Sequence, residues 1–158
     1  MNNRYINIYN NLVSLARNKN IYKEFTNQDT FSHRLIMLLF HFAFFLQIFK
    51  KKSDSKFLQS MYDFFFKQIE FSIREKGHGD ASINKKMKNY INVFHEMLSN
   101  INNWDSLGKT NKKNILFKYL DLNLDKDTKI VNYLDNYRNY LLNNTLNSLS
   151  KGVFKFNF

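Results

Sequence analysis

Four histidines are the side chains in this chain best suited to metal binding or proton transfer, and their spacing matches no known type of site. They are His33, His41, His78 and His95. No two are four residues apart, the separation that places two metal ligands on one face of a helix. The chain also has no cysteine, so it has no thiolate metal ligand, no disulfide and no cysteine nucleophile. We therefore expect no metal site and no cofactor.

His41 lies in the most apolar part of the sequence. A buried imidazole mainly needs a hydrogen-bond partner, so a satisfied core histidine is the favoured interpretation. The competing hypothesis is a helical enzyme in which His41, Asp63 and Glu70 converge in a pocket. The sequence has neither a nucleophile-elbow motif nor a glycine-rich phosphate loop after a strand. We therefore expect no enzymatic activity.

Residues 61–88 contain the most informative group of polar side chains. A helical pattern ends there in a charged pair, passes through a turn with Gly77 and Gly79, and resumes with lysines. The polar residues are Arg74, Glu75, His78, Asp80, Lys85, Lys86 and Lys88. One interpretation is structural: an ion pair of Arg74 locks the turn, and its candidate partners are Asp63, Glu70 and Asp80. The other is a polar surface that binds a protein partner, and both can hold together.

The charge of the chain is strongly positive. Its 158 residues include 24 Lys and Arg against 13 Asp and Glu, a formal net charge of +11. Such a charge suits RNA, a ribosomal surface or anionic lipid headgroups. The chain is also rich in Asn, Lys, Ile, Phe and Tyr, which A/T-rich codons favour, so base composition alone can raise the lysine content. A basic RNA- or ribosome-binding helical module is therefore one functional hypothesis.

The composition and the periodicity both indicate a helical fold. Proline is absent and glycine occurs only 4 times, whereas a β-rich domain usually needs more of both for its turns. Apolar residues recur at three- and four-residue steps, which predicts an all-α fold, a single compact bundle of about six helices in one domain over residues 1–158. The predicted helices cover residues 4–18, 31–51, 56–76, 82–101, 111–120 and 127–149.

The predicted helix ends follow from capping residues. Asp29 or Thr30 can cap the second helix, and Ser53, Asp54 or Ser55 the third. Gly77 is placed to end the third helix in the left-handed conformation, and Ser82 to cap the fourth. The tail over residues 152–158 alternates apolar and polar residues, and either docks on the body or forms a mobile end.

The apolar run from Leu35 to Leu46 is too short to be the usual membrane span. It contains His41 and is followed by Gln47, so it falls short of the ~20 residues that a bilayer needs. A central, buried helix is the favoured interpretation, and a helix that meets a membrane or a hydrophobic client is the alternative. The N-terminus has no uninterrupted apolar segment, so no signal peptide is expected.

The central stretch resembles the ubiquinol–cytochrome c chaperone family, which serves assembly of respiratory complex III. The family has an aromatic helix containing an aspartate, then Leu-Arg-Glu-Met-Gly-Val-Gly-Asp, then a helix of the Lys-Lys-Met-Lys type. The matching residues are Asp63, Phe66, Ile73 to Asp80, Ile83 and Lys85 to Lys88. Upstream, the residues in the family's order are Tyr9, Ala16, Arg17, Ile21, Tyr22, Asp29, Thr30, Arg34 and His41. The resemblance is best over residues 5–100. It departs from the family at Gln68, where an aspartate is usual, and at His33, where a glycine is usual.

The resemblance implies an all-α, non-catalytic protein with a protein client. The client would be newly made cytochrome b or another complex III subunit, and no small-molecule substrate is expected. The partner-binding surface would include Arg74, Glu75, His78, Asp80, Lys85, Lys86 and Lys88. The structural residues of the motif would be Asp29, Thr30, Arg34, His41, Asp63, Gly77 and Gly79. Because the client is apolar, phenylalanines of the second and third helices are expected to form an aromatic patch.

The location implied by the resemblance is peripheral to the inner membrane. The compact chain shows no transit peptide, which favours a bacterial protein on the cytoplasmic face. An organellar protein would lie on the matrix side of the mitochondrial inner membrane, where relatives work beside the ribosomal tunnel exit. A ribosomal or anionic membrane surface is therefore a further possible partner for the basic surface.

Overall fold

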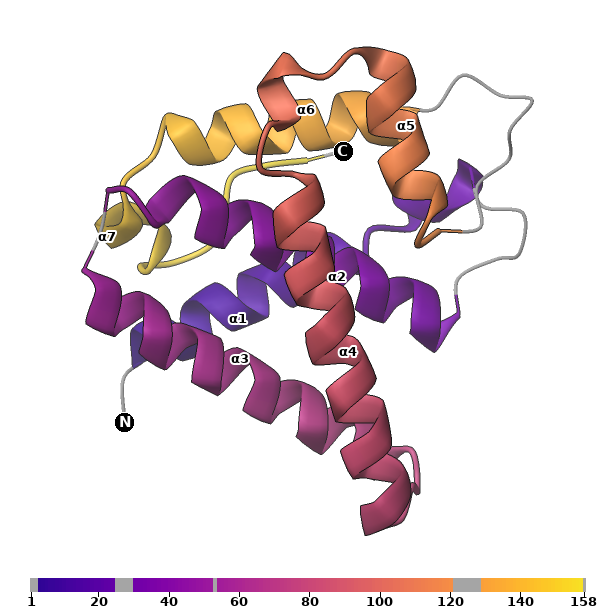
Figure 1. Ribbon diagram of the computed structural model, residues 1–158. Helices are drawn as coiled ribbons and strands as arrows, with labels where there is room; N and C mark the ends of the chain where they lie inside the picture. Colours follow the sequence, from indigo (N-terminus) through magenta and orange to yellow (C-terminus); the bar gives the residue numbers. More distant parts are fainter. Residues whose placement is uncertain (1–2, 25–29, 53, 121–128, 158) are drawn as a thin grey trace.

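The computed structural model describes residues 3–24, 30–52, 54–120 and 129–157. Within these residues it contains α-helices, two 3₁₀-helices and no strand, which confirms the predicted all-α fold. The elements, shown in Figure 1, are α1 (Asn3–Ala16), η1 (Lys19–Glu24), α2 (Phe31–Phe49), α3 (Ser55–Glu75), α4 (Asp80–Asn100), η2 (Trp104–Ser106), α5 (Lys109–Phe117), α6 (Lys129–Leu142) and α7 (Leu146–Leu149).

The central element is α2, around which α1, α4 and α6 pack. It is 19 residues long and, by length and composition, apolar enough to cross a membrane. Most of its side chains are nevertheless buried against the other helices, as predicted for a core helix. Its first turn is capped by Thr30, whose Oγ1 accepts a hydrogen bond from the backbone N–H of His33 at 3.1 Å. Asp29, the other predicted cap, lies outside the described residues.

Aromatic rings from three helices meet in the core. The ring of Phe42 on α2 stacks on Phe65 of α3 at 3.9 Å between centroids and lies 5.5 Å from Phe94 of α4. All three side chains are fully buried. The expected aromatic patch for a client is therefore wrong for most of the phenylalanines of α2 and α3, because they fill the core. Phe71 is exposed over 46% of its surface, and Phe31 and Phe64 are half-buried.

Several predicted helix boundaries differ from the structure. The helices predicted over residues 4–18, 31–51 and 111–120 end earlier, at Ala16, Phe49 and Phe117. Two further differences follow from capping. The fourth helix starts at Asp80 with Gly79 as its N-cap, and Ser82 lies inside the helix. An acidic residue in the first turn suits the positive end of the helix dipole, so the helix begins earlier than a serine cap would allow. The predicted helix over residues 127–149 is divided into α6 and α7. Thr145 and Ser148 form a capping box that starts a new helix.

The C-terminal tail is docked on the body, which decides between the two predicted alternatives for residues 152–157. The Nδ2 of buried Asn11 donates to the carbonyl of Gly152 at 2.8 Å, and its Oδ1 accepts from the N–H of Phe154 at 3.0 Å. The ring of Phe156 packs against tyrosines of α6 at Tyr133, Tyr137 and Tyr140. The tail therefore connects α1 with α6.

Candidate partner-binding site

The α3–α4 tip, defined as residues 74–88, projects from the body at the bottom of Figure 1. Buried Ile73 and Ile83 anchor its two sides in the core. Gly77 has a φ of 88°, in the left-handed region that favours glycine, and ends α3 as predicted. Gly79 has extended backbone and precedes α4. The two glycines therefore reverse the chain between two long helices.

Arg74 and Asp80 close the turn by an ion pair. The Nη1 of Arg74 donates to Oδ1 of Asp80 at 2.7 Å; the Asp80 side chain is largely exposed and that of Arg74 is exposed over 44% of its surface. This hydrogen bond raises the pKa of Arg74 above its usual value. Of the three predicted partners of Arg74, Asp80 is the one it contacts here. An exposed pair adds little stability, so its main effect is to orient the turn.

The remaining predicted residues lie at the same end of the molecule without forming one contact cluster. Glu75 and His78 are exposed on the turn, Lys85 and Lys88 are exposed on α4, and Lys86 is half-buried. Lys88 lies about 12 Å along α4 from Asp80, because each helical residue rises about 1.5 Å. The tip is therefore an extended polar surface with charges of both signs.

Glu75 and His78 have the Glu-x-x-His spacing of some metal-binding helices. Here α3 ends at Glu75 and the chain reverses at Gly77, so the two residues are not on one helical face. The described residues hold no cluster of three or more His, Asp or Glu side chains suited to a metal ion.

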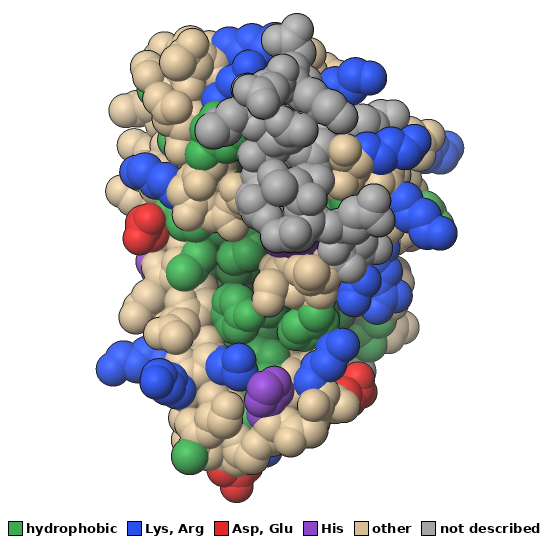
Figure 2. Space-filling model, turned by 90° about the vertical axis from the view of Figure 1, so that its right-hand side faces the viewer, with side chains coloured by type: hydrophobic (Ala, Val, Ile, Leu, Met, Phe, Trp, Pro, Cys, Tyr) green, Lys and Arg blue, Asp and Glu red, His purple; other side chains and the backbone are tan. Residues whose placement is uncertain are grey.

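One face at this end combines apolar and basic side chains. Figure 2 shows hydrophobic side chains in the lower half of this face, with Lys and Arg side chains on both sides. The half-buried hydrophobic residues at the start of α2 and on α4 include Phe31, Met87 and Tyr90. The polar tip therefore adjoins helices that expose some apolar surface.

His41 is a satisfied core residue, as predicted. Its Nδ1 lies 2.6 Å from the carbonyl oxygen of Met37 and its Nε2 lies 2.5 Å from the hydroxyl of Tyr133, so Nδ1 carries the proton and Nε2 accepts. Burial lowers the pKa of His41 to about 4 and raises the pKa of Tyr133. The imidazole is therefore neutral, and both of its nitrogens have hydrogen-bond partners.

The proposed catalytic group of His41, Asp63 and Glu70 does not form. The contacts of His41 are to α2 and α6. The carboxylate of Asp63 is exposed and accepts from Gln59 at 3.1 Å, while Glu70 pairs with Lys67 at 3.5 Å. The hypothesis of an enzyme with this site is therefore wrong.

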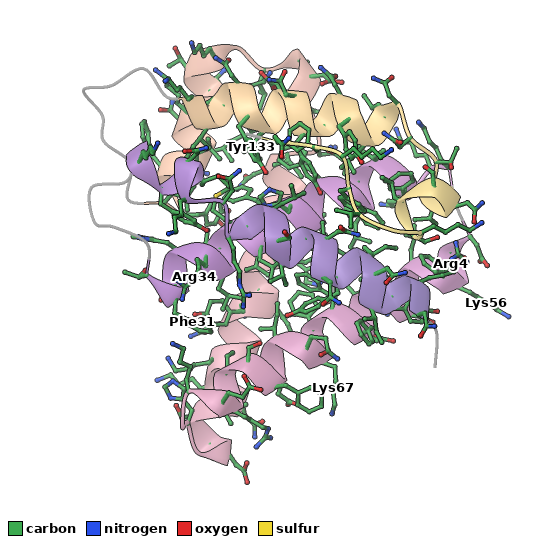
Figure 3. The ribbon with its side chains drawn as sticks, turned by 180° about the vertical axis from the view of Figure 1, so that it is seen from behind. Arg4, Phe31, Arg34, Lys56, Lys67 and Tyr133 are labelled. Carbon is green, nitrogen blue, oxygen red and sulfur yellow. The ribbon has the colours of Figure 1, made fainter. Side chains whose placement is uncertain are left out.

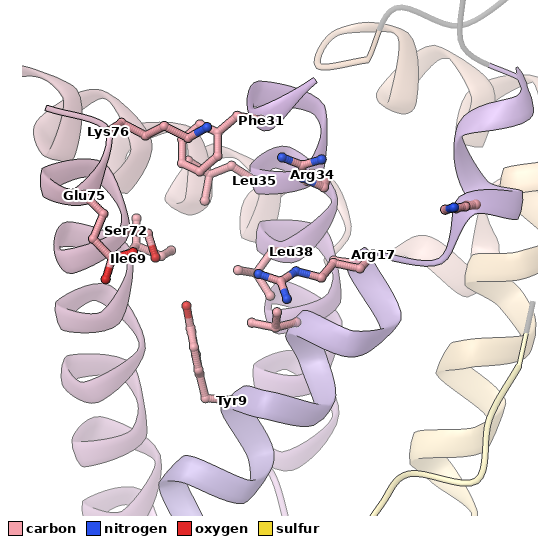
Figure 4. A pocket seen from close by; sticks show the side chains of 13 residues that line it. Tyr9, Arg17, Phe31, Arg34, Leu35, Leu38, Ile69, Ser72, Glu75 and Lys76 are labelled. Carbon is pink, nitrogen blue, oxygen red and sulfur yellow. The ribbon is translucent and has the colours of Figure 1, made fainter. Parts of the chain in front are cut away.

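A cleft of about 690 Å³ lies beside the tip, between the end of α1, the start of α2 and the end of α3. We call it the α1–α2–α3 cleft; its lining residues are Tyr9, Val13, Ala16, Arg17, Lys19, Phe31, Arg34, Leu35, Leu38, Ile69, Ser72, Glu75 and Lys76. Figure 4 shows Arg17 and Arg34 on one side, Glu75 and Lys76 on the other, and Tyr9 between them. Figure 3 shows that Phe31 and Arg34 lie at one end of the molecule, and Arg4 and Lys56 at the other.

The cleft has a basic rim and an apolar floor. The Nζ of Lys76 lies 4.7 Å from the ring centre of Phe31, which joins the end of α3 to the start of α2. Burial raises the pKa of Tyr9, although Ser72 and Arg17 act in the opposite direction. Sequence reasoning missed this site, because its residues come from three helices. The available signal was the presence of Arg17 and Arg34 in the resemblance pattern.

Comparisons with known proteins identify a family and a structure with a similar fold. The family model described as "Ubiquinol-cytochrome C chaperone" matches residues 23–155, which include the whole α3–α4 tip. The crystal structure of the Cbp3 homolog from Brucella abortus has a TM-score of 0.72 and 23% sequence identity, over 93% of this chain and 84% of that chain. That likeness shows a shared fold. No curated protein sequence matches the chain.

Proposed function

The chain belongs to the ubiquinol–cytochrome C chaperone family, and from this premise we propose that it binds newly made cytochrome b during assembly of complex III. The family match supports the role of a complex III assembly chaperone. The single observation that carries the proposal is the family match over residues 23–155. In this role the protein acts by holding and releasing its client, with no catalysis of its own.

The client-binding surface in this proposal is the α3–α4 tip. Its exposed lysines and Glu75 offer hydrogen-bond donors and acceptors, and the Arg74–Asp80 ion pair orients the turn between them. The phenylalanines of α2 and α3 are mostly buried, so they are not available to cover long apolar helices of a client. The tip therefore suits the polar segments of cytochrome b, with half-buried side chains such as Met87 and Tyr90 beside them.

The place of action in this proposal is the surface of the inner membrane. A bacterial protein would act there from the cytoplasm, and an organellar one from the matrix side. The net charge of +11 supports attraction to anionic headgroups or to a ribosome. Either surface would keep the protein near the site where cytochrome b is made and inserted.

The decisive experiment is gene deletion followed by complementation. Deletion is expected to lower both assembled complex III and cytochrome b, and the wild-type gene is expected to restore them. A tip variant, Lys85→Gln/Lys86→Gln/Lys88→Gln, is expected to restore them poorly. The matched control removes three lysines from α5 and its end, as Lys109→Gln/Lys113→Gln/Lys118→Gln, and is expected to complement fully. Normal complex III and cytochrome b after deletion would contradict the chaperone proposal.

An RNA- or ribosome-binding module remains the rival proposal, and the net charge favours it. It predicts that RNA binding by the purified protein falls steeply as salt increases, because bound cations are released from RNA. Such binding, together with normal complex III after deletion, would favour the rival.

A further inference from the structure

We propose that the α1–α2–α3 cleft binds an anionic phospholipid, with the phosphate at the basic rim and the first part of an acyl chain on the apolar floor. This inference assigns a second ligand to the protein. It does not depend on the identity of the client, and the cleft shares only Glu75 and Lys76 with the α3–α4 tip.

Charge is the first observation. The rim has Arg17 from the end of α1, Arg34 from α2 and Lys76 from the end of α3, with Lys19 beside them. Glu75 is the one acidic residue in the described lining. Cations on three elements surround a single opening, an arrangement that suits a compact anion contacted from several sides. Guanidinium groups bind phosphate oxygens by two parallel hydrogen bonds.

The floor is the second observation. Leu35, Leu38 and Ile69 are almost fully buried beneath the opening. Val13 and Phe31 are half-buried at its sides. The cleft volume of about 690 Å³ is typical of small-molecule sites. It can hold a headgroup and the upper part of an acyl chain, while the rest of the lipid stays in the bilayer.

The balance of donors and acceptors favours a lipid over an extended peptide. Arginine and lysine side chains are donors only, and Ser72 already donates its hydroxyl to the carbonyl of Gln68 at 3.1 Å. Phosphate and ester oxygens accept hydrogen bonds and need no acceptor in return. An extended peptide brings one backbone N–H per residue, each of which needs an acceptor when buried. Among the described lining residues, Glu75 is the one with a carboxylate acceptor.

The test uses the full-length protein and vesicle flotation. Wild-type protein is expected to float with phosphatidylcholine vesicles that contain phosphatidylglycerol, and not with pure phosphatidylcholine vesicles. The cleft variant Arg17→Gln/Lys76→Gln is expected to bind roughly twenty-fivefold more weakly, because each basic residue near an anionic surface contributes about fivefold. The matched control, Lys50→Gln/Lys51→Gln, removes two exposed charges just after the opposite end of α2 and is expected to lose much less.

A second measurement on wild-type protein makes the result independent of how the variants fold. Monomeric dihexanoyl phosphatidylglycerol is titrated and followed by NMR, and is expected to shift the signals of Val13, Leu35 and Leu38. Glycerol phosphate and polyglutamate are titrated as a free phosphate and an anionic polypeptide. Equal weakening in both charge variants, or lipid shifts outside the cleft, would overturn the proposal. The proposal would also be overturned if glycerol phosphate or polyglutamate bound as strongly as the lipid.

Discussion

At the residue scale, the neutral imidazole of His41 makes the stability of the fold depend on pH. The pKa of His41 is about 4 in the folded protein, against about 6.5 for an unperturbed histidine. Between these values the unfolded chain binds a proton that the folded protein excludes. This difference lowers the free energy of unfolding as the pH falls from 6.5 toward 4, by about 3 kcal/mol in total. Above pH 6.5 the histidine no longer affects the stability in this way.

The first prediction follows from this difference in pKa. Urea unfolding at pH 7 and pH 5 is expected to show that wild-type protein loses about 2 kcal/mol more over this range than a His41→Gln variant. The variant is expected to be less stable at pH 7, because glutamine does not reproduce both hydrogen bonds. An identical pH dependence in both proteins would show that His41 has the same pKa in the folded protein as in the unfolded chain.

A second residue-scale prediction concerns the left-handed backbone of Gly77. A Cβ at this position would meet no atom within 4 Å, so the cost of a substitution comes from the backbone alone. Gly77→Val is expected to lower the free energy of unfolding by about 1–2 kcal/mol, and Gly77→Asn by less, because asparagine tolerates this conformation. Chemical denaturation measures both. Equal losses in the two variants would point to a side-chain effect instead.

At the scale of the elements, exchanging the charges of the Arg74–Asp80 pair tests whether client binding depends on the orientation of the α3–α4 tip or on these two charges themselves. Because the guanidinium is occupied by Asp80 at 2.7 Å, we expect the pair to orient the turn. The single variants Arg74→Asp and Asp80→Arg should reduce the amount of cytochrome b that co-purifies with the protein. The double variant, in which the two charges are exchanged, should restore it. All three should unfold at a slightly lower urea concentration than the wild type, because exposed pairs contribute little and the changed charges suit the helix dipoles of α3 and α4 less well. A double swap as defective as the single variants would indicate that the client contacts these charges directly.

The elements also show where prediction from sequence succeeds and where it stops. Thr30, Asp54 and Gly77 set helix ends by local chemistry, so these ends could be predicted. The break between α6 and α7 could not, because the leucines on both sides keep helical spacing and conceal the capping box at Thr145. Polar side chains that hydrogen-bond to backbone groups can end a helix even where the apolar residues keep helical spacing.

Of the candidate sites, only the turn between α3 and α4 could be predicted from the sequence. Arg74 and Asp80 are six residues apart, so one turn brings them together. The α1–α2–α3 cleft depends on how three helices diverge, which periodicity does not encode. The buried state of Phe42 and Phe65 is likewise a property of the whole packing, since aromatic residues on a broad helical stripe suit a core or an exposed patch equally.

At the scale of the whole molecule, Asn11 holds the C-terminal tail on the first helix. Its side chain bonds Asn7, Gly152 and Phe154, the last two across more than 140 residues. Asn11→Ala is expected to lower the free energy of unfolding by about 2 kcal/mol, since it leaves the buried N–H of Phe154 without an acceptor. Hydrogen exchange at the Phe154 amide should also become faster. Exposed Asn10→Ala on the same helix is the control and should change neither quantity. Unchanged exchange in Asn11→Ala would mean that aromatic packing alone holds the tail.

The central place of α2 has a consequence for the synthesis of the protein. Translation produces α2 well before α4 and α6, two of the three helices that pack around it. During that interval the nascent chain displays a segment whose length and composition match a membrane span. Domains begin to fold while they are made, and exposed apolar surface at this stage favours misassembly. A protein of a chaperone family is thus itself at risk of being misdirected, until its own later helices have emerged.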